Sequence, residues 1–289
     1  MNQLLADNKV TTLRAYLRDK LSERYGHREA DNIVYALFDE FHGWSRTELV
    51  LRSNDRLGES ELLRYHFALK RMVQGEPLQY VLGCGWFMGM KLRATPAALI
   101  PRPETEELVR LVLEKNTLFA PKILDVGTGS GCIAIALKKQ LPEASVTAID
   151  ISEEALLLAG NNANLLQVNI NFKQVDILAN NSLGKFDIIV SNPPYIPWSE
   201  AATMAKHVTE HEPHLALFTE NGDPLVFYRR LMELTSTMLC PDGFVCCEIN
   251  EKLADNLLEL AQHYPIQTPE IYRDLQAKNR MIFWRAQHP

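Results

Sequence analysis

In Lys122-Ile123-Leu124-Asp125-Val126-Gly127-Thr128-Gly129-Ser130-Gly131, an apolar run passes directly into a loop that contains three glycines. A short run of this kind is typical of a strand buried in a parallel sheet. Glycine lets the backbone turn tightly after the strand and approach a ligand closely. The apolar segment 133–140 that follows predicts a helix. The stretch therefore predicts a strand, a glycine loop and a helix, which together open a doubly wound sheet.

The same alternation of strand and helix continues toward the end of the chain. Helical patterns at 133–140, 153–166 and 225–239 separate short apolar runs. These runs predict strands at residues 122–126, 145–150, 170–175, 186–190, 243–249 and 281–285. We expect the last of them to close the sheet as its final strand. The predicted fold class is therefore α/β, with a Rossmann-like sheet.

Residues 1–77 predict a small helical domain. Leu13, Leu17 and Leu21 recur at the spacing of one helix face. The segment 45–48, Ser-Arg-Thr-Glu, matches a capping box at the start of a further helix. Nothing in this domain looks catalytic, and a helical module beside a catalytic domain more often positions a macromolecular partner. We therefore predict a substrate-recognition domain.

Residues 78–103 predict a linker with a β-hairpin, because glycines alternate with aromatic and methionine side chains between positions 83 and 90. The segment 104–107, Glu-Thr-Glu-Glu, then begins a helix with acidic residues at its positive end. We assign residues 104–289 to the domain that holds the sheet.

Composition limits the possible environments and partners. The five cysteines are odd in number and contain no Cys-x-x-Cys pair, so they predict neither a disulfide framework nor a zinc knuckle. No apolar run approaches the roughly 20 residues that span a bilayer, and the N-terminus lacks the pattern of a signal peptide. We therefore expect a cytoplasmic protein with no membrane association.

The distribution of charge disfavours nucleic acid as a partner. Residues 1–80 carry equal numbers of basic and acidic residues, so the rest of the chain carries the whole net charge of −6. Proteins that bind nucleic acid usually show a basic footprint. No basic domain or arm stands out in this sequence.

The spacing of the glycines indicates the kind of ligand. A dinucleotide fingerprint is Gly-x-Gly-x-x-Gly, whereas here the third glycine comes one residue early, at Gly131, and Cys132 takes the expected position. The loop formed by Gly127, Thr128, Gly129, Ser130 and Gly131 suits a nucleoside that lacks a pyrophosphate. S-adenosylmethionine fits this requirement, and Asp125 supplies a carboxylate for its positively charged end.

Two further strand ends carry acidic residues in the order that such a donor needs. Asp150 ends the second predicted strand, where a carboxylate could accept bonds from two ribose hydroxyls. Asp176 follows the third strand and could accept a bond from the adenine amine, with Ile177 packed on the base. Each acid could instead be a helix N-cap, but three in this order beside the glycine loop favour a donor site.

Asn192-Pro193-Pro194-Tyr195 follows the predicted strand at 186–190 and indicates the reaction type. The nitrogen of an amide or aryl amine is a poor nucleophile, because its lone pair is delocalised. The Asn192 side-chain carbonyl and the Pro193 backbone carbonyl could accept both N–H bonds of one NH2 group. Tyr195 could pack on the planar group. The motif therefore predicts methylation of a planar nitrogen, with protein amides and nucleobase amines both open as acceptors.

Three stretches in order carry a resemblance to a known family. These are Leu99-Ile100-Pro101-Arg102-Pro103-Glu104-Thr105-Glu106, the glycine loop at 125–131 and Asn-Pro-Pro-Tyr at 192–195. With them the sequence resembles the peptide chain release factor N5-glutamine methyltransferases over nearly its whole length. Two departures concern linker packing and adenine contacts: Trp86 precedes the linker Phe87 where the family usually has an acidic residue, and position 177 is Ile rather than aromatic.

The resemblance implies an S-adenosylmethionine-dependent methyltransferase sheet and no metal. It implies transfer of a methyl group to the glutamine N5 of the Gly-Gly-Gln motif in class 1 release factors, leaving S-adenosylhomocysteine. Donor contacts are then expected at 127–131, Asp150, Asp176, Ile177 and Asn192, and glutamine contacts at 192–195. Ribosomal-protein glutamine methyltransferases and nucleic-acid amino methyltransferases share Asn-Pro-Pro-Tyr and stay open as alternatives. Arg102 and Glu104 stand at the pocket edge, either functional or paired with each other.

Overall fold

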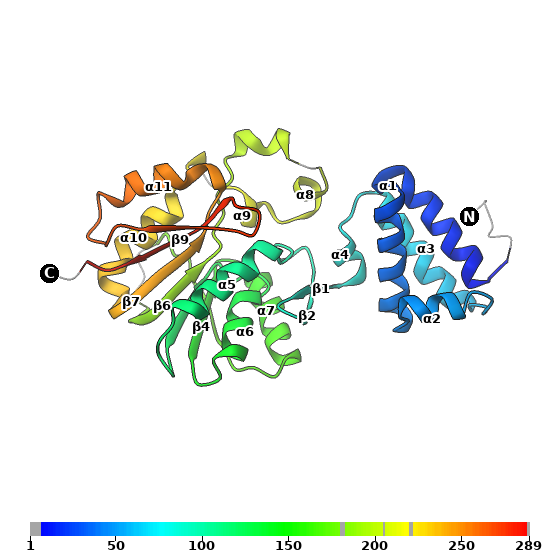
Figure 1. Ribbon diagram of the computed structural model, residues 1–289, viewed down its shortest axis with the longest axis horizontal. Helices are drawn as coiled ribbons and strands as arrows, with labels where there is room; N and C mark the ends of the chain where they lie inside the picture. Colours follow the sequence, from blue (N-terminus) through cyan, green and yellow to red (C-terminus); the bar gives the residue numbers. More distant parts are fainter. Residues whose placement is uncertain (1–6, 180–182, 205, 220–221, 288–289) are drawn as a thin grey trace. The chain divides into compact units, whose positions relative to one another are not determined.

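The sheet and its helices are seen in a computed structural model (Figure 1), which describes residues 7–179, 183–204, 206–219 and 222–287. The chain divides into two compact units, residues 1–83 and residues 84–289. None of the helices within these described residues is both long enough and apolar enough to cross a membrane.

From residue 7 on, the first unit consists of helices and the segments that connect them, with one isolated β-bridge between Lys9 and Arg56. Its helices are α1 (Val10–His42), α2 (Arg46–Leu51), α3 (Glu59–Val73) and α4 (Leu78–Leu82). Helix α1 is interrupted at Gly26, whose φ of 75° and ψ of 161° are not helical. The predicted capping box is confirmed, because Ser45 accepts from the Glu48 backbone N–H and the Glu48 carboxylate accepts from that of Ser45. Apolar side chains of α1 and α3 form the core of this unit.

An arginine fastens α4 to the end of α3. The Arg71 guanidinium donates two hydrogen bonds to the Glu76 carboxylate and one each to the Tyr80 and Val81 carbonyls. Apolar spacing predicts the end of the helical domain at residue 77, whereas the helical unit of the structure runs through α4 to residue 83.

The second unit begins with a hairpin. Strands β1 (Cys84–Phe87) and β2 (Met90–Arg93) pair in antiparallel register, with Phe87 opposite Met90. Beyond it lies a seven-stranded sheet with the order β5-β4-β3-β6-β7-β9-β8. Its strands are β3 (Lys122–Val126), β4 (Ser145–Asp150), β5 (Asn171–Gln174), β6 (Phe186–Ser191), β7 (Leu239–Glu248), β8 (Glu270–Arg273) and β9 (Asn279–Arg285). The strands β5, β4, β3, β6 and β7 run parallel to one another.

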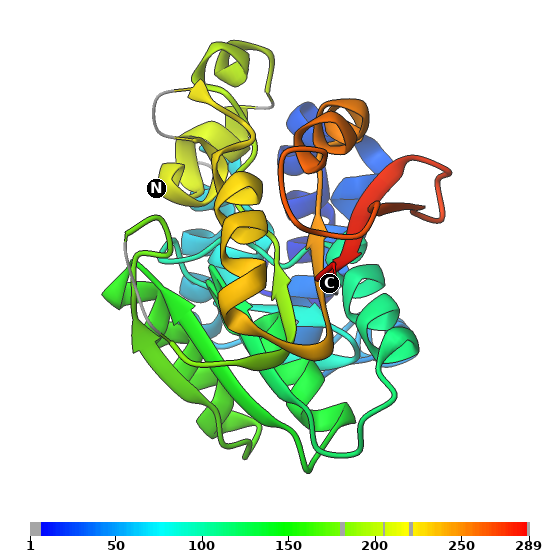
Figure 2. The same ribbon diagram turned by 90° about the vertical axis from the view of Figure 1, so that its left-hand side faces the viewer.

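Helices cover both faces of this sheet (Figures 1 and 2). Alternate strand residues decide which face each side chain joins. Ile123 and Ile188 pack with α5 (Pro103–Lys115), α6 (Cys132–Gln140) and α7 (Glu153–Leu165). Leu124 and Ile189 pack with α10 (Val226–Met238) and α11 (Ala254–Ala261) on the other face. This three-layer arrangement confirms the predicted α/β fold class.

The strand predicted at 281–285 is confirmed as β9, the last strand along the chain, but the sequence did not predict β8. Strand β9 pairs with β7 on one side and with β8 on the other, both antiparallel, so β8 forms the edge of the sheet. The β8 sequence is short and half-polar, Glu-Ile-Tyr-Arg, as suits an exposed edge, and it lacks the apolar run by which buried strands are found.

Short helical segments complete the chain on either side of the sheet elements. They are η1 (Trp198–Thr203), α8 (Lys206–His211), α9 (His214–Leu217) and η3 (Glu251–Leu253). Because β3, β4, β6 and β7 are parallel, their carboxyl ends meet at one edge. The glycine loop, Asp150, Asn192 and Glu248 all follow or end these strands, so the fold brings them to that edge.

Candidate active site

One cavity of about 250 Å³ lies at this edge of the sheet. The loop at residues 97–102 and the segment 213–218 also contribute to its walls. The site residues predicted from the sequence that line it are Gly127, Thr128, Gly129, Ser130, Asp150, Asp176, Ile177, Asn192, Pro193 and Pro194. Three predicted residues are not among its lining: Asp125, Gly131 and Tyr195.

The glycine loop needs its glycines for two different reasons. Gly127 has a φ of +71°, and a Cβ there would meet no atom within 4 Å. Gly131 has a φ of +81°, and a Cβ there would lie 3.0 Å from the Ala159 Cβ. Gly127 thus leaves open space at the cavity wall, whereas Gly131 allows α6 to begin directly against α7.

Asp125 lies beneath this loop rather than in the cavity. Its Oδ2 accepts hydrogen bonds from the Thr128 hydroxyl at 2.6 Å and from the Ala134 backbone N–H at 3.2 Å. Among the described residues its Oδ1 has no hydrogen-bond partner. Complete burial raises the pKa of Asp125 to about 7. In this structure the carboxyl therefore connects the glycine loop to the first turn of α6.

Asp150 reaches the cavity from the end of β4. Its Oδ2 accepts from the Gly129 backbone N–H at 2.8 Å, and its Oδ1 accepts from that of Ser152 at 3.0 Å. A carboxylate has about four lone-pair positions. Two remain available in Asp150, so this half-buried side chain can still accept from two ligand hydroxyls.

Asp176 and Ile177 follow β5 and also line the cavity. Asp176 Oδ1 accepts from the Leu178 backbone N–H at 2.9 Å. Ile177 is buried, and its carbonyl accepts from the Arg230 guanidinium. An apolar wall beside a carboxylate can hold the flat face and the amine edge of a purine.

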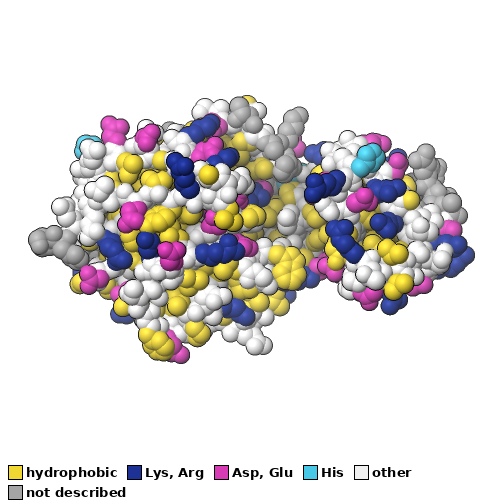
Figure 3. All heavy atoms as spheres, viewed as in Figure 1, with side chains coloured by type: hydrophobic (Ala, Val, Ile, Leu, Met, Phe, Trp, Pro, Cys, Tyr) yellow, Lys and Arg dark blue, Asp and Glu magenta, His cyan; other side chains and the backbone are white. Residues whose placement is uncertain are grey.

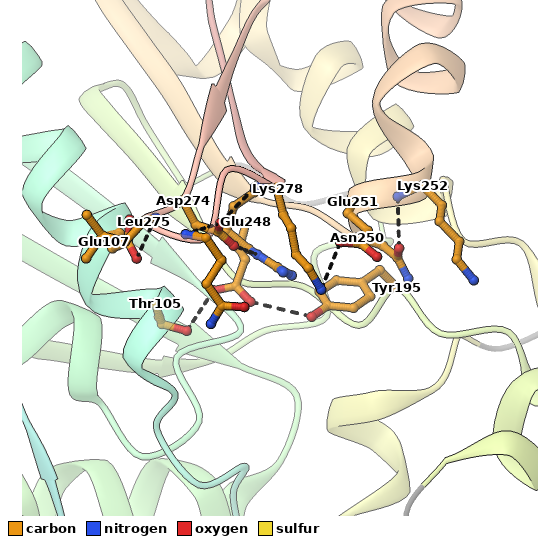
Figure 4. A network of polar contacts seen from close by, with 12 residues as sticks. Thr105, Glu107, Tyr195, Glu248, Asn250, Glu251, Lys252, Asp274, Leu275 and Lys278 are labelled. Atoms are coloured by element: carbon orange, nitrogen blue, oxygen red, sulfur yellow. Dashed lines mark hydrogen bonds and ion pairs between the residues drawn. The ribbon is translucent and has the colours of Figure 1, made fainter.

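Asn192, Pro193 and Pro194 line the cavity after β6. The Asn192 side-chain NH2 donates to the Thr105 hydroxyl at 3.1 Å. Tyr195 is not part of the cavity lining, and its hydroxyl lies 3.5 Å from Glu248 Oε1 (Figure 4). Its ring packs against the core that contains α10.

Sequence reasoning missed two buried polar residues beside Asn192, of which Thr105 also lines the cavity and Glu248 does not. Glu248 ends β7 with 3% of its surface exposed, and Thr105 in α5 has 2% exposed. The Thr105 hydroxyl lies 2.7 Å from Glu248 Oε2. Burial raises the pKa of Glu248 to about 7. An acidic residue at the end of an apolar strand is the signal that identified Asp150, and it applies equally to Glu248.

Arg102 pairs with a residue far along the chain. Its guanidinium donates to Glu212 Oε1 at 2.6 Å, and the Ile100 backbone N–H donates to Glu212 Oε2 at 3.2 Å. The sequence left open whether Arg102 is functional or pairs with Glu104, and in the structure its guanidinium binds Glu212. The Glu212 side chain is 1% exposed, so a buried carboxylate joins the two segments at 97–102 and 213–218 that line the cavity.

Comparisons with known proteins identify the family. The family described as PrmC N-terminal domain matches residues 12–83, and the one described as Methyltransferase small domain matches residues 105–238. The release factor glutamine methyltransferase of Flavobacterium psychrophilum is 40% identical over 278 residues, which cover 94% of this chain and 98% of that protein. The protein of the same name from Bacteroides thetaiotaomicron is 36% identical over 277 residues, with 95% and 98% covered.

This chain belongs to the release factor glutamine methyltransferase family. The resemblance found in its motifs is thereby confirmed. The similarity to the release factor glutamine methyltransferases covers both units of the chain, because the matched residues include the helical unit and the sheet.

Solved structures agree with the fold of this release factor glutamine methyltransferase family member. A methyltransferase from Pyrococcus furiosus has a TM-score of 0.53 at 19% identity, covering 70% of this chain and 91% of that one. The hMettl16 catalytic domain, solved in complex with MAT2A 3'UTR hairpin 6, has a TM-score of 0.55 at 16% identity, with 80% and 83% covered. At these identities the similarity establishes the methyltransferase fold alone.

Proposed function

We propose that this chain transfers a methyl group from S-adenosylmethionine to the side-chain amide nitrogen, N5, of a glutamine in class 1 peptide chain release factors. One observation carries the chemistry: Asn192 lines the cavity, and its side-chain NH2 donates to the Thr105 hydroxyl. Its carbonyl oxygen is then the end available to a substrate amide. The names of the relatives support glutamine of a release factor as the acceptor.

The cavity residues fit S-adenosylmethionine. Asp150 can accept from the ribose hydroxyls, and Asp176 with Ile177 suits the adenine. The absent Cβ of Gly127 leaves open space that a side chain would fill. When bound, the donor supplies a methyl group on a positively charged sulfur, and S-adenosylhomocysteine remains after transfer. Nothing in this chemistry requires a metal ion.

The chain's own residues provide mainly positioning. The Asn192 carbonyl and the Pro193 carbonyl accept the two N–H bonds of the glutamine amide, which localises the nitrogen lone pair toward the methyl group. Prolines suit this loop because they have no backbone N–H to compete for these carbonyls. Tyr195, whose ring lies on the side of the α10 core, supports the loop from behind. A proton leaves the methylated amide to water after transfer.

The distribution of charge supports a protein acceptor over nucleic acid. On the face shown in Figure 3, basic side chains alternate with acidic ones on both units. A phosphate backbone would favour a continuous basic surface instead.

Labelled donor tests this function directly. The purified chain is incubated separately with a class 1 release factor, ribosomal proteins and nucleic acid, and the modified peptide is mapped by mass spectrometry. We expect one methyl group on the glutamine of the Gly-Gly-Gln motif. Label confined to a ribosomal protein or to nucleic acid would replace the proposed acceptor with that one.

An asparagine variant tests the assigned role. Asn192→Ala should lose at least 100-fold in turnover, because an amide-orienting acceptor is removed, while the affinity for the donor changes little. The control is Asn161→Ala, an exposed position on α7. Turnover of Asn192→Ala near that of the control would refute the role of Asn192.

A further inference from the structure

The proposed chemistry leaves one buried acid without a role. Glu248 ends β7 behind Asn192, away from the cavity lining. Its Oε2 lies 2.7 Å from the Thr105 hydroxyl and its Oε1 lies 3.5 Å from the Tyr195 hydroxyl (Figure 4). Its backbone carbonyl accepts from the Tyr228 hydroxyl at 2.8 Å. A buried carboxyl costs free energy unless its hydrogen bonds are made, so this arrangement requires an explanation.

The directions of these hydrogen bonds follow from the chemistry of the groups. An ionised carboxylate only accepts, so the Thr105 hydroxyl must donate its single proton to Glu248. The Thr105 oxygen can then only accept, and the Asn192 NH2 donates to it at 3.1 Å. Because the amide is planar, its NH2 end and its carbonyl end point in different directions. Fixing the NH2 end therefore decides which end of Asn192 is presented to the cavity.

We propose that Thr105 and Glu248 are positioning residues for methyl transfer, which hold the Asn192 amide with its carbonyl as the acceptor for the substrate NH2. This inference rests on the proposed function. Neither residue needs to touch the substrate, because their effect passes through the Asn192 side chain. Tyr195 is held by the same carboxylate, so one acid supports both polar members of the substrate loop.

Protonation of Glu248 would remove the fixed direction of the hydrogen bonds that run from Asn192 through Thr105 to Glu248. A carboxylic acid can donate to the Thr105 oxygen, and the Thr105 hydroxyl could then donate to the carbonyl of a flipped Asn192. Burial raises the pKa of Glu248 to about 7. The ionisable groups that face it from the neighbouring elements are Glu104 of α5, Cys132 of α6, Tyr195, Tyr228 of α10 and Arg280 of β9, of which Arg280 favours the carboxylate and Glu104 opposes it.

The first experiment compares three threonine variants of the full chain. Thr105→Val keeps the shape but removes the hydroxyl, and we expect kcat to fall about 10- to 100-fold with little change in KM for the release factor. Thr105→Ser restores the hydroxyl and should recover kcat to within about 3-fold. Thr235→Val is the matched control, because Thr235 is also buried, accepts from the Trp284 N–H and donates to the Leu231 carbonyl. Equal kcat in Thr105→Val and the control would overturn the inference.

The pH profile separates positioning from support of the fold. Wild-type kcat should fall as the pH falls through about 7, when Glu248 gains its proton. Glu248→Gln cannot gain a proton at this position, so its kcat should be lower and its acid limb should shrink to the part contributed by Asp125, whose pKa is also raised to about 7. A profile that keeps the same acid limb in Glu248→Gln would refute the assignment to Glu248.

An NMR measurement needs no turnover. In the wild type, the Asn192 side-chain NH2 signals, assigned by their loss in Asn192→Ala, should exchange slowly with solvent and should shift as Glu248 titrates. In Thr105→Val they should exchange at least 10-fold faster. Unchanged exchange in Thr105→Val would overturn the inference. If the wild type methylates no release factor but the NH2 is protected as expected, the proposed function fails while the orientation of Asn192 stands.

Discussion

Alanine at Gly131 should destabilise the sheet-containing unit without touching the cavity. The residue has a φ of +81°, and the left-handed conformation costs an L-residue about 1–2 kcal/mol. The new Cβ would also lie 3.0 Å from the Ala159 Cβ and 3.2 Å from both the Ala159 Cα and the Ile135 Cδ1. Overpacking of this kind typically costs about 1–3 kcal/mol. Loss of unfolded-state entropy offsets about 0.4–1 kcal/mol. We expect a net decrease of about 2–4 kcal/mol in the free energy of unfolding.

Alanine at Gly127 is the matched control. It pays a similar conformational cost at a φ of +71°, but its Cβ meets no atom within 4 Å. The decrease in the free energy of unfolding should therefore stay near 1 kcal/mol. Gly127 lines the cavity, so the added methyl group occupies space that a ligand needs. S-adenosylmethionine should bind at least 10-fold more weakly to Gly127→Ala.

Two assays read these effects separately. Urea unfolding followed by circular dichroism gives the free energy of unfolding, and calorimetric titration with S-adenosylmethionine gives the affinity under conditions where each variant is folded. We expect opposite orders in the two assays. Gly131→Ala should show the larger decrease in the free energy of unfolding, and Gly127→Ala should show the larger loss of affinity for S-adenosylmethionine relative to its loss of stability. Equal destabilisation in the two variants would refute the reasoning from the Ala159 contact.

Three further predictions concern charge. Asp125 and Glu248 have pKa values raised to about 7, so between about pH 4 and 7 the folded state holds protons that the unfolded state releases. The free energy of unfolding should therefore fall as pH rises from 5.5 to 8, by about 2 kcal/mol for each group, and Glu248→Gln should reduce this slope in urea titrations. Arg102→Ala leaves a buried Glu212 without its cation and should cost about 2 kcal/mol or more, with weaker donor binding by calorimetry. Arg71→Lys loses the two-bond pair with Glu76 and the hydrogen bonds to the carbonyls of α4. It should decrease the free energy of unfolding of the helical unit by about 1 kcal/mol and so lower its thermal midpoint. Reversing the charge of an exposed residue elsewhere on the helical unit should leave that midpoint unchanged.

The sequence predicted those elements of the fold that are determined by residues close together in the chain. The capping box at 45–48 and the strand at 122–126 are visible in the sequence because neighbouring residues alone decide them. The edge strand β8 was missed because its half-polar residues carry no such pattern, and its pairing with β9 is decided by the sheet. Helix α4 was missed because it is short and is fastened by a side chain of the preceding helix, Arg71.

The site was predictable to the level of strand ends but not to the level of individual hydrogen bonds. Parallel strands bring their carboxyl ends to one edge, so the order of motifs placed most of the predicted residues around one cavity. The Arg102–Glu212 pair joins positions more than a hundred residues apart, and no spacing rule reaches that far. From the sequence, Thr105 is only a polar residue in the acidic first turn of a helix. Its hydrogen bond to Glu248 could not be predicted, because Glu248 lies far along the chain at the end of β7.

Three acids at the carboxyl edge show why a strand-end position does not by itself identify a ligand contact. Asp150 and Glu248 are the last residues of β4 and β7, and Asp125 lies one residue before the end of β3, yet only Asp150 lines the cavity. Asp125 uses its carboxyl to hold the glycine loop, and Glu248 uses its carboxyl on the Thr105 hydroxyl. Both are buried and have raised pKa values, whereas Asp150 is half-buried with lone pairs to spare. Burial thus separates the acids that build the loops from the acid that can meet a ligand. We propose that Asn192, whose side-chain NH2 donates to the Thr105 hydroxyl, likewise presents its carbonyl to the cavity.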